Sequence, residues 1–121
     1  MASEQISWGK VKEELMRRLV SEGIEVEGND VPQWLEDAKI YDLATTAEML
    51  RSILAEDGTL IEQAWTYIDE EGWYYSGIWR INYGGREYYV AFHEEPYYLL
   101  VKAYTNKDDA KRMLSNGKKQ D

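Results

Sequence analysis

Residues 73–105 read WYYSGIWRINYGGREYYVAFHEEPYYLLVKAYT, and this stretch decides the fold. Apolar and aromatic side chains recur at every second position through most of it, which is the period of a β-strand with one buried face. Gly84-Gly85 is a two-residue hairpin turn. Such a turn pairs Tyr83 with Arg86, so it fixes the register of the two flanking strands.

Three antiparallel strands joined in chain order follow from this pattern. They are predicted at Trp73–Tyr83, Arg86–Glu94 and Tyr97–Thr105, with a tight turn near Glu95-Pro96. The hairpin register predicts the pairs Ile81/Tyr88, Trp79/Val90 and Gly77/Phe92, and the third strand is expected to place Leu99, Val101 and Ala103 beside Phe92, Val90 and Tyr88. The second face is then expected to carry the polar rows Ser76/His93/Tyr98, Arg80/Tyr89/Lys102 and Asn82/Glu87/Tyr104, with the apolar row Ile78/Ala91/Leu100 between the first two.

Helical periodicity and capping residues predict helices before and after the meander. The first helix is predicted over about Ser7–Glu22, and a short second helix is capped by Asp30. The third helix begins with the capping box Thr45-Thr46-Ala47-Glu48 and ends at Asp57-Gly58. The last helix is capped by Asn106 and ends at Gly117. Residues 25–29 are interpreted as an acidic turn, and residues 118–121 as a frayed tail.

The segment from Leu60 to about Glu70 has two interpretations. Thr59-Leu60-Ile61-Glu62 resembles a second capping box, and apolar residues follow at helical spacing, so a helix is predicted. The segment is also rich in β-branched and aromatic residues, which favour a fourth strand. The whole chain is therefore predicted to be one α+β domain over residues 1–121, a three-stranded antiparallel meander, or one of four strands, with the N-terminal helices and the C-terminal helix packed on one face.

Composition limits the classes of function. The 121 residues include no cysteine, so disulfides and thiolate metal sites are excluded and a reducing, cytoplasmic location is expected. No signal peptide or membrane span is recognised, and no membrane partner is expected. A single histidine, no nucleotide-binding glycine motif and no calcium-loop spacing predict that the protein uses no metal and no cofactor.

Charge is the most unusual property of the sequence. The formal net charge is −9, but the segment from Glu22 to Glu71 alone holds fourteen carboxylates against Lys39 and Arg51, a local net charge of −12. Such concentrated charge indicates a basic partner more than a reaction. Ten tyrosines and five tryptophans supply the amphipathic rings that anchor interfaces.

The function predicted from this charge is non-catalytic binding to the basic surface of a nucleic-acid-handling protein, with no direct contact to nucleic acid. Dense carboxylates can imitate the phosphates of a duplex and occupy a groove rich in lysine and arginine. The expected contacts are Glu36, Asp37, Glu56, Asp57, Asp69, Glu70 and Glu71, with Trp73 and Tyr74 as apolar anchors. In size, charge and element order the chain resembles the small acidic phage inhibitors of anti-restriction and anti-CRISPR type, some of which mimic DNA, and more loosely the acidic immunity proteins of nuclease toxins. That resemblance implies an inhibitor in the cytoplasm of a host cell.

Two alternatives stay open. The predicted second face brings His93 near Tyr98, Arg80 and Lys102, which is a possible site for a small metal-independent ribonuclease or toxin. In that enzyme His93 acts as general base and the cations hold the phosphate. The other alternative is an interaction domain or assembly chaperone without a nucleic-acid connection.

Overall fold

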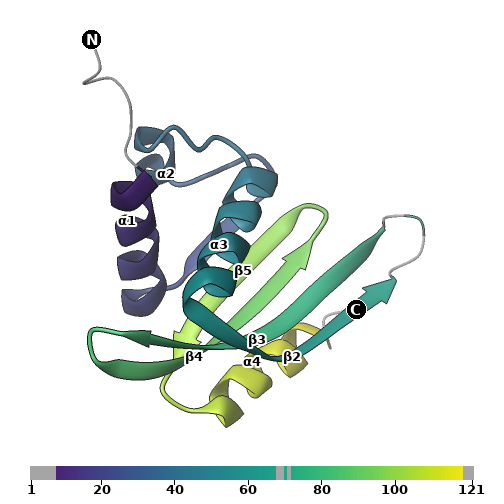
Figure 1. Ribbon diagram of the computed structural model, residues 1–121. Coiled ribbons are helices and arrows are strands. Elements are labelled where there is room, and N and C mark those ends of the chain that lie inside the picture. Colours follow the sequence, from purple (N-terminus) through teal and green to yellow (C-terminus); the bar gives the residue numbers. More distant parts are fainter. Residues whose placement is uncertain (1–7, 68–69, 71, 119–121) are drawn as a thin grey trace.

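The computed structural model describes residues 8–67, 70 and 72–118. Along the chain the elements are α1 (Trp8–Ser21), β1 (Ile24–Glu27), α2 (Gln33–Asp37), α3 (Leu43–Asp57), β2 (Gly58–Tyr67), β3 (Trp73–Tyr83), β4 (Arg86–Glu95), β5 (Tyr98–Tyr104) and α4 (Lys107–Lys118). Figure 1 shows these elements in three layers, with a twisted sheet between helices on both sides. The predicted α+β class is confirmed.

The sheet contains five strands in the order β1-β5-β4-β3-β2, and each pair of neighbours is antiparallel. The predicted count of three or four strands was therefore too low. The predicted hairpin register is confirmed, since Tyr83 faces Arg86 and Gly77 faces Phe92 across β3 and β4. A two-residue loop allows only this alignment of the two strands.

The predicted register of β5 was wrong by two residues. Val101 faces Phe92, and Leu99 faces Glu94. The cause is that β4 continues through Glu95, so the turn consists of Pro96 and Tyr97. A shift of two residues keeps each side chain on its predicted face, because side chains alternate with a period of two. It moves each residue of β5 by one row along the sheet.

The acidic turn predicted at residues 25–29 was also wrong over its first part, which forms the edge strand β1. Ile24 and Val26 are buried, whereas Glu25 and Glu27 point outward. Four residues are enough here because β1 pairs along its whole length with β5. The alternation of apolar and acidic residues is the strand signal that the charge of this segment obscured.

β2 replaces the helix predicted from Leu60 to about Glu70. α3 ends at Asp57 and the strand begins at the next residue, Gly58, so the apparent capping box has no free turn in which to form. A Cβ at Gly58 would lie 2.8 Å from the carbonyl oxygen of Arg80 on β3, which explains why glycine occupies this junction. Ladder pairing with β3, interrupted by a bulge between Leu60 and Glu62, decides in favour of the strand.

Helix starts differ from the predictions in two places. Pro32, not Asp30, occupies the N-cap of α2. α3 begins before the predicted capping box, because the Asp42 carboxylate accepts a 2.7 Å hydrogen bond from the Thr45 amide. Two hydrogen bonds from Thr45, the backbone one foremost, lower the pKa of Asp42.

The cap predicted at the start of the last helix is confirmed. Asn106 accepts a 2.9 Å hydrogen bond from the Asp109 amide. α4 does not stop at Gly117, since it extends through Lys118. The remainder of the predicted tail, residues 119–121, lies outside the described residues.

Two cores hold the layers together. The larger core joins α1 and α3 to one face of the sheet and includes Leu15, Leu50 and Phe92. The smaller core joins Ala110 and Leu114 of α4 to Ile78 and Ala91 on the opposite face, here called the α4 face. The prediction that all helices pack on one face was therefore wrong. Ile78 and Ala91 form an apolar row that needs its own cover, and α4 supplies it (Figure 1).

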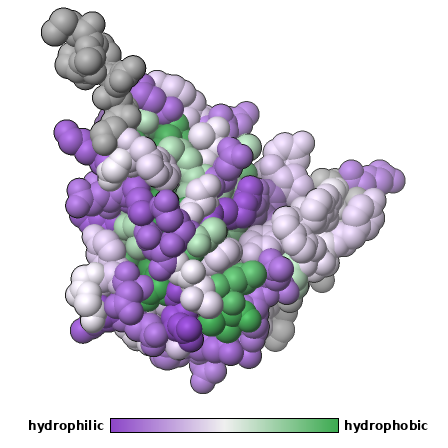
Figure 2. All heavy atoms as spheres, viewed as in Figure 1, coloured by the Kyte–Doolittle hydropathy of each residue, from purple (hydrophilic) through white to green (hydrophobic). Residues whose placement is uncertain are grey.

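The surface is mostly hydrophilic on the side that Figure 2 shows, with a few hydrophobic areas, the largest of them low in the view. The arm at the right of both figures is formed by the C-terminal end of β2 and the N-terminal end of β3. Its pale colour reflects tryptophan and tyrosine, since Trp65, Tyr67 and Trp73 are exposed there. None of the described helices has both the length and the apolar character needed to traverse a lipid bilayer.

A candidate acidic groove

An open groove of about 740 Å³ lies on the α4 face, between the β1–β5 edge of the sheet and α4. Its lining combines carboxylates with aromatic rings. The residues that line it are Glu25, Glu27, His93, Glu95, Tyr98, Leu100, Tyr104, Asp109, Arg112 and Met113. We call this the acidic groove, because it contains four carboxylates and one arginine.

The strand alternation of β1 positions two of these carboxylates. Ile24 and Val26 point into the larger core, so Glu25 and Glu27 project from the α4 face. Glu27 faces Tyr98 across the ladder, and Tyr98 in turn faces Glu95 on β4. The sheet therefore sets a tyrosine ring between two carboxylates in one row.

The neighbouring row is bound to the first one by two side-chain contacts. Tyr98 donates a 2.8 Å hydrogen bond from its hydroxyl to Glu25. Glu95 lies 2.7 Å from Nε2 of His93, measured from its Oε2 atom. Both contacts cross diagonally between rows and hold the groove side chains in defined positions.

His93 lies at the inner side of the groove, with its side chain only 6% exposed. Its ring centroid is 5.3 Å from that of Tyr74 and 6.3 Å from that of Tyr98. Nδ1 is buried and has no hydrogen-bond partner among the described residues. When Nε2 donates to the Glu95 carboxylate, Nδ1 is left as an acceptor.

α4 supplies the opposite wall. Asp109 and Met113 face the groove, and Arg112 donates a 2.7 Å hydrogen bond to Asp109. Within the described residues no lysine or arginine lies within 4 Å of Glu25, Glu27 or Glu95. The groove therefore keeps most of its negative charge.

The acidic groove changes the pKa of Tyr98. Burial, followed by the hydrogen bond to Glu25 and the charges of the neighbouring carboxylates, raises the pKa of Tyr98 to about 12. A tyrosinate here would be desolvated and repelled by the groove, so the neutral phenol is favoured.

The first prediction concerns this tyrosine at alkaline pH. Because the folded pKa lies above the unfolded value of about 10, the stabilisation that it provides is complete below about pH 10 and is lost as the pH rises towards 12. Absorbance titration of tyrosinate should show that Tyr98→Phe loses one late-titrating step. In guanidinium chloride the wild-type tyrosines should titrate together near about pH 10. Loss of an early step in the variant would contradict the assignment.

The residues proposed for a ribonuclease are not brought together. His93 shares its row with Ser76 and Leu100, Lys102 faces Ala91 one row away, and Arg80 faces Tyr89 one row further. Arg80 is four positions along β3 from Ser76, the residue opposite His93, which is about 13 Å along the strand. Arg80 lies 3.6 Å from Glu87 instead. Of the alternative site, only His93 and Tyr98 line the same groove.

The acids predicted as partner contacts occupy three separate places. Glu36 and Asp37 are exposed on α2. Glu56 and Asp57 are exposed at the end of α3, where Lys12 lies 2.9 Å and 2.8 Å from their carboxylates. Glu70 is exposed between β2 and β3, while Asp69 and Glu71 lie outside the described residues.

The two predicted aromatic anchors belong to different faces. Trp73 is exposed on the β2–β3 arm and lies against Trp65, with ring centroids 4.3 Å apart. Tyr74 lies beside His93 on the α4 face. The sequence analysis did not select Glu25, Glu27, Glu95 or Asp109 as site residues, although the alternation in Ile24-Glu25-Val26-Glu27 was available as a signal.

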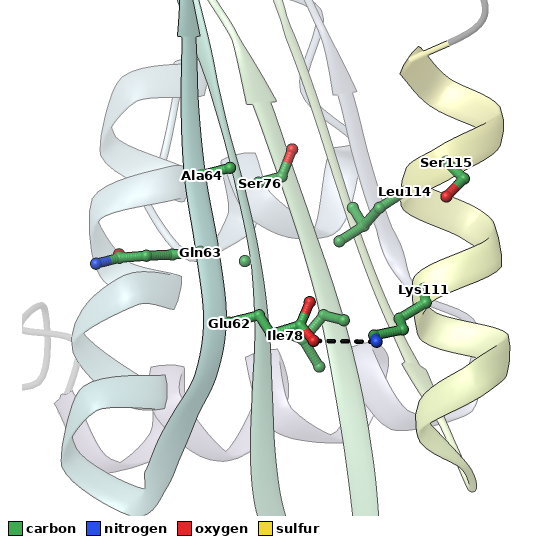
Figure 3. A pocket seen from close by; sticks show the side chains of 9 residues that line it. Glu62, Gln63, Ala64, Ser76, Ile78, Lys111, Leu114 and Ser115 are labelled. Carbon is green, nitrogen blue, oxygen red and sulfur yellow. Dashed lines mark ion pairs between the residues drawn. The ribbon is translucent and has the colours of Figure 1, made fainter.

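A second, smaller pocket of about 300 Å³ lies between β2, β3 and α4 (Figure 3). Glu62 reaches across it to Lys111, at 3.1 Å, and Lys107 lies 3.7 Å from the same carboxylate. The two charged residues that line this pocket, Glu62 and Lys111, neutralise each other, so its lining offers no excess charge to a ligand. Its Ser76 hydroxyl is buried and has no hydrogen-bond partner within the described part of the chain.

Within residues 8–67, 70 and 72–118, no three histidine or carboxylate side chains converge as ligands for one ion.

Comparison of the chain with family models, curated proteins and solved structures finds no match.

Proposed function

We propose that the protein is a non-catalytic inhibitor that binds the basic surface of a nucleic-acid-handling protein, in the manner of anti-restriction or anti-CRISPR proteins. The observation that carries the proposal is the acidic groove. It gathers Glu25, Glu27 and Glu95 around Tyr98, with no lysine or arginine among the described residues within 4 Å of these carboxylates. A positive partner surface would supply the missing charge.

The remaining exposed acids extend this negative field. Glu36, Asp37 and Glu48 lie exposed on helices. The net charge of the molecule is −9, so the field around it is negative on average. Such a field attracts a basic partner before contact and raises the association rate. It also repels nucleic acid, which favours binding to a nucleic-acid-handling protein over binding to its substrate.

The absence of catalysis is part of the proposal. A general base has to reach a substrate proton at hydrogen-bond distance. The side chain of His93 is 6% exposed and engaged by Glu95, and Arg80 lies two rows away along the sheet. These positions favour a binding role for the groove over phosphate-ester cleavage.

The test is binding to a panel of purified restriction endonucleases and RNA-guided nucleases, measured by biolayer interferometry at low salt. We expect at least one member of the panel to bind, in the cytoplasmic setting where such enzymes act. Glu25→Gln combined with Glu27→Gln should weaken that binding. If every nuclease fails to bind at low salt, the proposal is wrong.

A further inference from the structure

We propose that the acidic groove binds an arginine side chain of the basic partner. This inference rests on the function proposed above. The occupant is a guanidinium group inserted between β5 and α4. Three features of the groove lead to this choice: the spacing of its carboxylates, its aromatic surfaces and the unpartnered nitrogen of His93.

The carboxylates surround a space that is larger than a bare ion. Glu27 and Glu95 stand on either side of Tyr98 in one row, and Glu25 lies in the next row on β1. Asp109 faces them from α4. The four carboxylates come from three elements, β1, β4 and α4, so the negative charge is distributed along the groove. Guanidinium is a delocalised cation and can bind two carboxylates through separate N–H groups.

Aromatic rings provide the other half of the site. Tyr98 and Tyr104 line the groove together with His93. Arginine stacks on aromatic faces and is less strongly hydrated than the ammonium of lysine. The apolar side chains of Leu100 and Met113 suit the methylene stem that precedes the guanidinium. The combination favours arginine over lysine.

His93 adds an independent observation. The residue is 5% exposed and lines the groove, and its Nδ1 atom has no partner among the described residues. With Nε2 donating to Glu95, Nδ1 is a buried acceptor that lacks a donor. A guanidinium group carries five N–H donors and no acceptor, so its chemistry complements that of this side of the groove.

In the experiment, the 121-residue chain is labelled with ¹⁵N and titrated with N-acetyl-arginine amide. We expect chemical-shift changes at backbone amides of β1, β5 and the first half of α4, with a dissociation constant of about millimolar, as suits a small ligand. N-acetyl-citrulline amide has nearly the same shape without the charge and should leave these amides unchanged. N-acetyl-lysine amide should bind more weakly than the arginine amide.

Two variants localise the effect. Glu27 pairs with β5 through its backbone, and its exposed side chain makes no hydrogen bond or ion pair with another described residue, so Glu27→Gln should fold and weaken arginine-amide binding by about threefold to tenfold. Glu48→Gln changes an exposed acid on α3, outside the groove, and should bind as the wild type does. Equal binding by citrulline and arginine amides, silent groove amides, or equal weakening by both variants would overturn the inference.

The result also separates this inference from the proposed function. Nuclease binding that Glu27→Gln leaves unchanged, with silent groove amides, would overturn the arginine site and leave the inhibitor proposal standing. Groove-confined shifts with arginine amide in a protein that binds no nuclease would support the guanidinium site and overturn the inhibitor proposal.

Discussion

Replacing Phe92 with alanine should lower the free energy of unfolding by about 3–5 kcal/mol. Phe92 lies in β4, the middle strand of the five, and is 0% exposed. Its ring contacts that of Tyr75 edge-on at 5.7 Å, and the Arg51 guanidinium lies 5.9 Å from it. Truncation would leave a cavity between the sheet and the helices that cover it, and the surrounding side chains can refill it only in part.

Urea denaturation followed by far-ultraviolet circular dichroism measures this change. Tyr97→Ala is the matched control, because Tyr97 is 74% exposed in the turn between β4 and β5. Its effect should stay within about 0.5 kcal/mol. A Phe92→Ala protein as stable as the control would show that the larger core does not centre on β4.

Nuclease binding should weaken by about tenfold or more when the salt concentration rises from about 50 to about 200 mM, which corresponds to about 1.4 kcal/mol or more. The Debye length falls over this range from about 14 to about 7 Å. Glu25 and Glu27 are exposed, so salt screens them effectively. The field of the whole chain, with its net charge of −9, is screened in the same way.

The slope of affinity against salt concentration is the quantity to measure. Glu25→Gln combined with Glu27→Gln should make that slope shallower, since two of the interacting charges are removed. Glu13→Gln combined with Glu48→Gln removes the same charge from exposed positions of α1 and α3, outside the groove, and should change the slope less. Binding that does not respond to salt would contradict an electrostatic interface.

The centre of the sheet could be predicted because its determinants are local. Gly84-Gly85 permits one short turn, and that turn aligned β3 with β4 correctly from Gly77 to Tyr83. The cap at Asn106 was found for the same reason, since its side chain bonds an amide three residues away. Signals that depend on a few adjacent residues can be interpreted without knowledge of the rest of the fold.

The edges of the sheet depend on distant partners, and there the predictions failed. β1 is four residues long, so its alternation of apolar and acidic residues is a weak signal, and pairing with β5 decides in favour of the strand. β2 satisfies both helical and strand patterns, and pairing with β3 decides between them. α4 covers the opposite face from α1 and α3 because Ile78 and Ala91 make that face apolar. The sequence analysis had already placed these two residues in an apolar row on the second face.

The candidate site was predicted only in fragments for a related reason. His93 and Tyr98 were selected, but in a shifted register and beside the cations Arg80 and Lys102, which lie in other rows. Glu25 and Glu27 come to Tyr98 from a segment more than seventy residues earlier. No spacing within the sequence connects them, so only the assembled sheet reveals the groove.

The most direct test of the central claim is competition with DNA. A fluorescent DNA duplex bound to a nuclease from the binding panel is titrated with this protein, and anisotropy reports the bound fraction. The inhibitor proposal predicts that the protein displaces the duplex at low salt, and that Glu25→Gln combined with Glu27→Gln does so less effectively. A duplex that stays fully bound at saturating protein would contradict the claim that the acidic groove occupies a nucleic-acid-binding surface.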